Sequence, residues 1–204
     1  LAGSSAASDV YKRQVKAGLD LLNELIEEKR SNPTDDFLST LILAEEEGEK
    51  LSNWEMCALT GAVLAAGSDT AVDLHSYLIK ALLSHPEQLE ELKQDEELIQ
   101  NAISETLRYE SSGKTGLARY VSEDMELLGV EVKKGQMIQL ITSTAGLDPN
   151  TYDDPDTFDI HRNHDKSISF GQGPHYCIGV TLVRSQTEVM LRELFNRFPN
   201  LSLT

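Results

Sequence analysis

The chain has 204 residues, 40% of them hydrophobic, and a formal net charge of −16 at pH 7. This size and composition suit one sizeable folded core or a large part of one. The acidic balance argues against nucleic acid as a partner, because phosphates attract basic surfaces.

Residues 1–14 begin with small and polar side chains and resemble a sequence joined to the gene by cloning or assembly. They lack the basic start and apolar core of a signal peptide, so we expect a leader that is non-native or disordered. The longest uncharged apolar stretch, residues 56–67, is too short to span a bilayer, and we expect no membrane segment. Two cysteines offer no disulfide framework, which favours a reducing compartment, the cytoplasm.

Two helices are predicted near the start. The spacing of apolar residues indicates an amphipathic helix over residues 15–30, which Asn32 and Pro33 end. A short helix is expected over residues 35–44. The acidic run 45–50 is interpreted as a solvated loop.

A much longer helix is predicted next. Ser52 and Glu55 match a capping box, and the helical pattern runs to about Ser84, just before Pro86. Such a helix would be about 50 Å long. Its middle is apolar nearly all round, which predicts burial, and Cys57 within it is expected to be a core residue.

Inside this helix, the six residues from Ala66 to Ala71 read Ala-Gly-Ser-Asp-Thr-Ala. Gly67 weakens a helix, and a buried Asp69 needs hydrogen-bond partners. One interpretation is a helix crossing that requires small residues, with Asp69 and Thr70 bonded locally. Taken by itself, the motif favours this interpretation.

Two further helices are expected over residues 87–93 and 97–109. In the second, Glu105 and Arg108 are spaced i,i+3. By itself, such a pair indicates an ordinary surface salt bridge that stabilises the helix slightly.

From Leu117 the pattern changes to that of β-strands. Strands are predicted over residues 119–121, 125–128 and 137–142, with a turn at Gly129. The sequence therefore predicts a mainly α fold with a small β-sheet.

Residues 170–179 read Phe-Gly-Gln-Gly-Pro-His-Tyr-Cys-Ile-Gly. Gly171, Gly173 and Gly179 allow positive φ and remove Cβ atoms that would block a flat ligand. The residues from 178 onward read as the first turns of a helix, so the Cys177 thiol would lie near the positive end of a helix dipole. This position favours the thiolate, which is an iron ligand.

The residues alone also allow Cys177 to be a packing residue or a zinc ligand. A lone cysteine in a tight turn is more often a buried packing residue, although packing does not require flanking glycines. Zinc is considered because His161, His164 and His175 lie nearby. Structural zinc sites usually show paired ligand arms, and this region has a single sulfur.

The run Phe-Gly-x-Gly-x-His-x-Cys-x-Gly is similar to the haem-ligand signature of the cytochromes P450, the haem-thiolate monooxygenases. The resemblance implies haem b (iron protoporphyrin IX), with Cys177 as the axial iron ligand. It also implies that His175 and Arg119 bind the haem propionates. The other residues implied to line the haem are Phe170, Gly171 and Gly179.

The same resemblance gives the earlier motifs a role. Ala66 and Gly67 would form an oxygen-binding groove over the haem, and Asp69 and Thr70 would relay protons to dioxygen. Ala71 replaces the usual second Thr or Ser.

The resemblance implies a different role for Glu105 and Arg108. The family carries Glu-x-x-Arg at this place, buried on the cysteine side and completed by a third basic residue, here Arg162. This network is structural rather than catalytic.

The resemblance extends over residues 15–204, with three motifs in the family's order, but covers about half of the family fold. The expected fold is its C-terminal portion, with the long central helix, the Glu-x-x-Arg helix, the meander and the Cys loop, and without the N-terminal half. Two segments depart from the family pattern. Residues 111–114 lack the usual proline, and residues 145–149 read Ala-Gly-Leu-Asp-Pro instead of Ala-Asn-Arg-Asp-Pro.

The implied activity of the complete protein is insertion of one oxygen atom of O₂ into a small apolar organic substrate. Electrons would come from a ferredoxin or another electron-transfer protein, which the slightly basic region 161–204 could dock. A peroxide-driven or isomerase-type haem-thiolate enzyme is the first alternative, and a non-haem helical scaffold is the second. Asp69 and Thr70 favour the monooxygenase, because a peroxide-driven enzyme needs no proton relay. The chain by itself is expected to be inactive.

Overall fold

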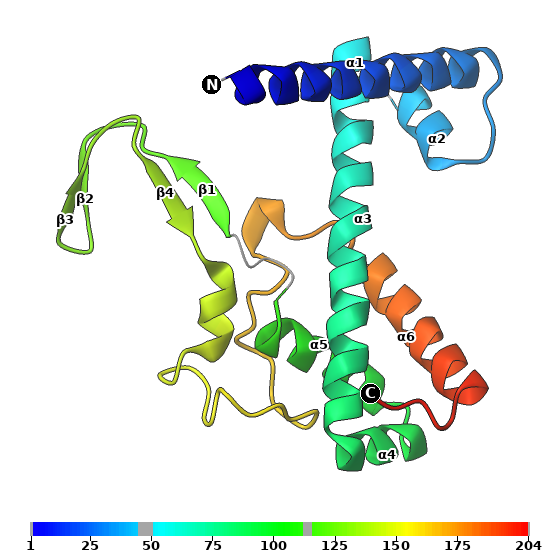
Figure 1. The fold of residues 1–204 in the computed structure, drawn as a ribbon, viewed down its shortest axis with the longest axis vertical. Helices are drawn as coiled ribbons and strands as arrows, with labels where there is room; N and C mark the ends of the chain where they lie inside the picture. Colours follow the sequence, from blue (N-terminus) through cyan, green and yellow to red (C-terminus); the bar gives the residue numbers. More distant parts are fainter. Residues whose placement is uncertain (1, 45–50, 112–115, 204) are drawn as a thin grey trace. The chain divides into compact units, whose positions relative to one another are not determined.

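The structure is a computed structural model that describes residues 2–44, 51–111 and 116–203. It divides into two compact units, Leu1–Ser68 and Asp69–Thr204. The predicted loop at residues 45–50 lies outside the described residues, as does most of the proline-free segment. The described helices (Figure 1) are α1 (Ala2–Ser31), α2 (Phe37–Leu43), α3 (Asn53–Ser84), α4 (Pro86–Gln94), α5 (Leu98–Tyr109) and α6 (Val180–Arg197), with short 3₁₀ helices η1 (Thr142–Leu147) and η2 (Gly173–His175).

The first helix begins much earlier than the sequence predicted. α1 starts at Ala2 instead of residue 15, and it ends at Ser31, next to the predicted stop. No proline interrupts the early residues, and alanine, which recurs there, is the best helix former. Whether residues 1–14 are native to the protein stays a prediction.

The first unit has a small core where α1 and α2 pack on the beginning of α3. Ile26, Met56 and Cys57 are buried there, which confirms Cys57 as a core residue. The capping box is also confirmed, because Ser52 N donates to Glu55 Oε2 at 2.9 Å and Glu55 N donates to Ser52 Oγ at 3.3 Å. These bonds satisfy amide groups that the first turn of a helix leaves unpaired.

α3 has 32 residues and a length of about 48 Å, and it ends at Ser84 as predicted. The prediction that its middle is buried is wrong for this structure. Residues 62–70 are all exposed, whereas burial occurs at the two ends, for example at Met56 and Leu78. The apolar middle is exposed because no described side chain covers it.

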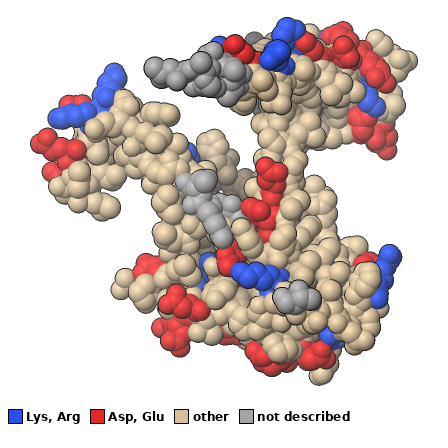
Figure 2. Space-filling view, viewed as in Figure 1, with Lys and Arg blue, Asp and Glu red and all other residues tan. Residues whose placement is uncertain are grey.

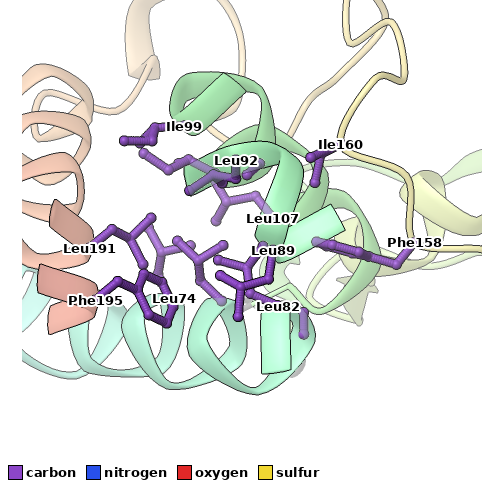
Figure 3. Close-up of a cluster of buried hydrophobic side chains, with 14 residues drawn as sticks. Leu74, Leu82, Leu89, Leu92, Ile99, Leu107, Phe158, Ile160, Leu191 and Phe195 are labelled. Carbon is purple, nitrogen blue, oxygen red and sulfur yellow. The ribbon is translucent and has the colours of Figure 1, made fainter. Parts of the chain in front are cut away.

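The second unit has the larger core. Figure 3 shows side chains from α3, α4, α5 and α6 meeting with Phe158 and Ile160 from the long connection before α6. α4 follows Pro86, which suits the first position of a helix, and crosses the end of α3 (Figure 1). α5 carries seven buried residues, more than its apolar stripe predicts, because Glu105 and Arg108 are among them.

The strands form two small antiparallel sheets rather than one. β1 (Leu117–Tyr120) pairs with β4 (Met137–Leu140), and β2 (Met125–Leu127) pairs with β3 (Val130–Val132). Leu128 and Gly129 both have positive φ, 52° and 81°, as a tight hairpin turn requires. β3 was not predicted, although β2, which is equally short, was. A mainly helical fold with small antiparallel sheets confirms the predicted fold class.

No described helix combines the length and the apolar character that crossing a bilayer requires. On the face shown in Figure 2, acidic side chains are spread over both units, and basic side chains lie among them.

Candidate functional site

The loop before α6 is closed by backbone hydrogen bonds. Cys177 N donates to Phe170 O at 2.9 Å, and Tyr176 N donates to Gly173 O at 3.0 Å. Gly171 and Gly173 have φ of 73° and 70°, a conformation that side chains with a Cβ rarely adopt. The sequence correctly identified these two glycines as conformational requirements.

Gly179 does not adopt the positive φ expected of it, and its predicted place beside the haem stays a prediction. Its φ is −82°, so it needs no left-handed conformation, and it is the N-cap residue of α6, which begins at Val180 rather than at residue 178. A Cβ at Gly179 would lie 3.8 Å from Cys177 Sγ, an ordinary contact. The sulfur therefore lies close to the residue that starts α6.

Cys177 is exposed, which does not fit a buried packing cysteine. Its two neighbours in the chain, Tyr176 and Ile178, also expose their side chains, and Ile178 is 91% exposed. A Cβ on Gly173 would meet no atom within 4 Å. An accessible sulfur, open space over the loop and an apolar surface are what a flat iron-containing ligand requires, so the residues fit a haem.

The predicted propionate ligands lie on different elements. His175 is exposed on η2, inside the Cys177 loop. Arg119 is exposed on β1, opposite Ile138 of β4, and its Nη1 donates to Ala118 O at 2.9 Å. Among the described residues, no hydrogen bond joins Arg119 to the Cys177 loop. Their shared role stays a prediction.

The residues predicted to form the oxygen groove all belong to α3. Ala66 and Gly67 are in the first unit, and Asp69 and Thr70 are in the second. All four residues are exposed, and α3 continues through them without a break. Ser68 Oγ donates to Leu64 O at 2.6 Å, a bond that often bends a helix.

Glu105, Arg108 and Arg162 are brought together by the fold. Arg108 Nε and Nη2 donate to the two oxygens of Glu105 at 2.8 and 2.7 Å. Arg162 Nε lies 3.3 Å from Glu105 Oε1, and Asp159 N donates to the same oxygen at 2.8 Å. Glu105 and Arg108 are almost fully buried, so the pair is not the surface salt bridge that i,i+3 spacing alone indicates.

Both arginines also anchor the connection that leads to the Cys177 loop. Each donates to several backbone carbonyl groups, which satisfies the rest of the guanidinium fork. The acceptors are the oxygens of Gly146, Pro155 and Thr157 for Arg108, and of Asp153, Asp154 and Thr157 for Arg162. The network therefore ties α5 to a segment that is distant in sequence.

His164 is a member of this cluster that the sequence did not assign. Its Nε2 lies 3.6 Å from Glu105 Oε2, and both of its ring nitrogens are buried without a hydrogen-bond partner among the described residues. Burial lowers the pKa of His164. Glu105 opposes this effect, and the arginines 108, 162 and 184 add to it. The only sequence signal was its position two residues after Arg162.

The basic side chains of α6 are largely engaged within the protein. Arg184 is half-buried and donates to α5. Arg192 pairs with Glu96 and Glu188, and Arg197 pairs with Glu193. Arg192 and Arg197 remain partly exposed in these ion pairs, so docking of a redox protein by the region 161–204 stays a prediction.

Within the described ranges, no three His, Cys, Asp or Glu side chains gather in a way that could hold a metal ion. The three histidines considered as zinc ligands beside Cys177 have different surroundings. His161 pairs with Glu91 at 2.8 Å, His164 lies near Glu105, and His175 belongs to η2.

The family model for cytochrome P450 matches residues 4–201 of the chain. The epothilone C/D epoxidase of Sorangium cellulosum is 39% identical over 190 residues, which cover 93% of this chain and 45% of that protein. The 6-deoxyerythronolide B hydroxylase of Saccharopolyspora erythraea is 36% identical over 186 residues, which cover 91% of this chain and 46% of that protein. The solved structure of cytochrome P450 PksS, from the bacillaene polyketide synthase of Bacillus subtilis 168, matches with a TM-score of 0.91 and 35% identity over 98% of this chain and 52% of that chain. The chain thus spans about half the length of these relatives.

Proposed function

Because the chain belongs to the cytochrome P450 family, we propose that it supplies the C-terminal portion of a haem-thiolate monooxygenase. The full-length protein inserts one oxygen atom of O₂ into a small apolar organic substrate. The hydroxylase and epoxidase named among the relatives support this reaction type. The observation that carries the proposal is the exposed thiol of Cys177, next to the N-terminal end of α6 in a loop that leaves space for a flat ligand.

In this proposal the chain holds haem b. Cys177 would provide the sulfur ligand of the iron, and Phe170 and the glycines 171 and 179 would line the haem. His175 and Arg119 bind its propionates as hydrogen-bond donors. The haem supplies the iron on which O₂ is reduced, and the thiolate favours cleavage of the O–O bond. The cluster of Glu105, Arg108 and Arg162 keeps the connection to the Cys177 loop in place.

The residues of α3 provide space for O₂ and transfer protons to the site where it is reduced. Ala66 and Gly67 leave space for O₂, because neither side chain extends beyond a methyl group. A carboxylate oxygen of Asp69 would take up a proton from bulk solvent and pass it on to Thr70 Oγ1, whose own hydroxyl proton would move on toward the haem side, so that both groups return to their starting states.

The electrons come from a separate redox protein, for which a ferredoxin is the proposed class. The protein works in the reducing cytoplasm, consistent with two free cysteines. The chain alone is proposed to be inactive, because it spans about half the length of its relatives and exposes apolar side chains such as Ile178 next to Cys177.

A peroxide-driven haem-thiolate enzyme is the second candidate. It would share Cys177 but would not need Asp69 and Thr70 as a relay. The presence of both residues on the exposed stretch of α3 favours the monooxygenase.

The test uses the full-length protein, obtained by recovering the upstream reading frame. Reduced protein treated with carbon monoxide should show the Soret band of a thiolate-ligated haem. Cys177→Ala should abolish this band, because no other described thiol is exposed. Cys57→Ala is the matched control and should keep it, because Cys57 is buried in the first unit. An unchanged band in Cys177→Ala would disprove the proposal.

A further inference from the structure

Arg184 joins α6 to α5. Its Nη1 lies 3.2 Å from Gln100 O and 3.3 Å from Gln100 Oε1, and its Nη2 donates to Ser104 Oγ at 3.0 Å. Burial lowers the pKa of the Arg184 guanidinium, but a guanidinium stays charged in proteins. The side chain is therefore a half-buried cation fixed to the helix that also carries Glu105.

The same guanidinium lies against the start of the Cys177 loop. Its central carbon is 5.4 Å from the centroid of the Phe170 ring, within the range of a cation–π contact. Phe170 O in turn accepts the hydrogen bond from Cys177 N at 2.9 Å. An unbroken chain of contacts thus runs from α5 through Arg184 and Phe170 to the backbone of Cys177.

The loop is held by Arg184 at both of its ends. Phe170 precedes Cys177 by seven residues, and Arg184 follows it by seven residues. One end is held by the ring contact, and the other end continues into α6, which Arg184 fastens to α5. Movement of the Arg184 side chain would therefore disturb both ends of the loop together, while the hydrogen bond from Gln100 Nε2 to Glu188 Oε2 and the shared core still hold α6 on α5.

The charge of Arg184 distinguishes it from the other arginines of α6. Arg192 and Arg197 form ion pairs with glutamates, whereas Arg184 has no carboxylate partner among the described residues. A half-buried cation without a counter-ion costs desolvation energy, and an apolar side chain would avoid that cost. The planar guanidinium group donates several hydrogen bonds and also places a flat face against the Phe170 ring. An apolar side chain could not do both.

We propose that Arg184 is a positioning residue that fixes the Phe170 ring, and through it the Cys177 backbone, so that the sulfur stays in place as the thiolate ligand. The inference rests on the proposed function, because it concerns the ligand that holds the haem. Arg184 does not contact the reacting atoms in this proposal.

The experiment compares Arg184→Met, Arg184→Lys and Phe170→Leu in the full-length holoprotein. Arg197→Met is the matched control, since it removes a guanidinium from the exposed end of the same helix. The measurement uses two Soret bands of the reduced carbon monoxide complex: the thiolate-type band, and a shorter-wavelength band from protein that has lost the thiolate ligand. The quantity compared is the ratio of the shorter-wavelength band to the thiolate-type band. The measurement is made well below the melting temperature of each variant, so that loss of global stability does not change the ratio.

Arg184→Met should raise this ratio roughly 3- to 10-fold, the effect of losing a cation–π contact and hydrogen bonds of ordinary strength. Arg184→Lys keeps the charge but loses the planar fork, so its ratio should lie between those of the wild type and Arg184→Met. Phe170→Leu should resemble Arg184→Met, and the double variant should add little, because the two residues act through one contact.

A ratio in Arg184→Met equal to that in Arg197→Met would overturn the inference. If Arg184→Met does not fold, the test relies on Arg184→Lys and Phe170→Leu. A band ratio equal to that of the wild type in both variants would likewise overturn the inference. Absence of a thiolate-type band in the wild-type holoprotein would instead contradict the proposed function.

Discussion

At the scale of single residues, Thr70 distinguishes the monooxygenase from its peroxide-driven alternative. If Thr70 Oγ1 delivers a proton during O₂ reduction, Thr70→Ala should consume reductant at a comparable rate but release more hydrogen peroxide and form less product. Thr70→Ser keeps the hydroxyl and should stay close to the wild type. Product formed per reductant consumed is measured for the three full-length proteins. Unchanged coupling in Thr70→Ala would count against the relay.

Glu105 is expected to act on folding rather than on chemistry. Its removal leaves the buried Arg108 guanidinium without its partner, which costs about 3–5 kcal/mol for a buried pair. We expect Glu105→Ala to yield little soluble holoprotein. Glu193→Ala, which removes an exposed partner of Arg197, should change the free energy of unfolding by less than about 1 kcal/mol. Denaturant unfolding of the full-length protein compares the two, and a stable, haem-loaded Glu105→Ala protein would contradict the buried geometry.

His164 should make the protein sensitive to acid. Its pKa is lowered from 6.5 in the folded protein, chiefly by burial. The unfolded chain therefore binds a proton that the folded protein does not, and the stability that His164 contributes is lost as the pH falls below about 6.5. His164→Phe should reduce the fall in melting temperature between neutral and mildly acid pH.

The same substitution should not weaken the protein at neutral pH. Both ring nitrogens of His164 lack partners among the described residues, so an apolar ring avoids burying unsatisfied polar atoms. His161→Phe is the control, because His161 is exposed and pairs with Glu91. An equal acid sensitivity in His164→Phe and the wild type would contradict this prediction.

At the scale of elements, η1 packs against the end of α5 at Gly146. A Cβ on Gly146 would collide with Arg108 O, and it would also lie 3.0 Å from Arg108 Cγ. The backbone must therefore come close at this point, where Gly146 O accepts a hydrogen bond from Arg108 Nη1 at 2.7 Å. The glycine at 146, one of the departures from the family pattern, thus has a local structural reason.

Gly146→Ala should destabilise the full-length protein by about 1–3 kcal/mol, because the new methyl group overpacks the contact with α5. Gly18→Ala should have the opposite effect, since Gly18 lies in α1 with no atom within 4 Å of the added Cβ and alanine favours helices. Both predictions are tested by comparing the melting temperature of each variant with that of the wild type. A neutral Gly146→Ala would show that η1 and α5 are less closely packed.

At the scale of the whole molecule, the chain exposes large apolar side chains around Cys177 and along α3. Ile178 and Leu182 beside the loop are exposed, as are Leu64 and Val72 on α3. Exposed apolar patches of this kind favour association with other surfaces. We expect the 204-residue chain alone to bind hydrophobic dyes or aggregate, and to take up haem poorly. Spectral titration with haem and dye fluorescence test this, and tight stoichiometric haem binding by this chain would contradict it.

The features that the sequence predicted correctly depend on neighbours along the chain. The capping box at Ser52, the end of α3 at Ser84 and the left-handed glycines of the Cys177 loop each follow from hydrogen bonds or backbone sterics within a few residues. The family membership was also readable, because the spacing of the motif around Cys177 is local. Local rules failed for β3, which was not recognised as the strand that follows the turn at Gly129, and for the start of α1, where small and polar residues suggested a leader rather than a helix.

The sequence by itself determined the motifs, the order of the helices and the family. Only the tertiary structure decided which side chains meet. Glu105, Arg162 and His164 form one cluster although the first lies far from the other two in sequence. Arg184, which belongs to the slightly basic region 161–204, is held between α5 and Phe170. The physical reason is that burial and pairing of a charge depend on what the fold places around it, whereas helix capping and glycine conformations depend on the adjacent backbone.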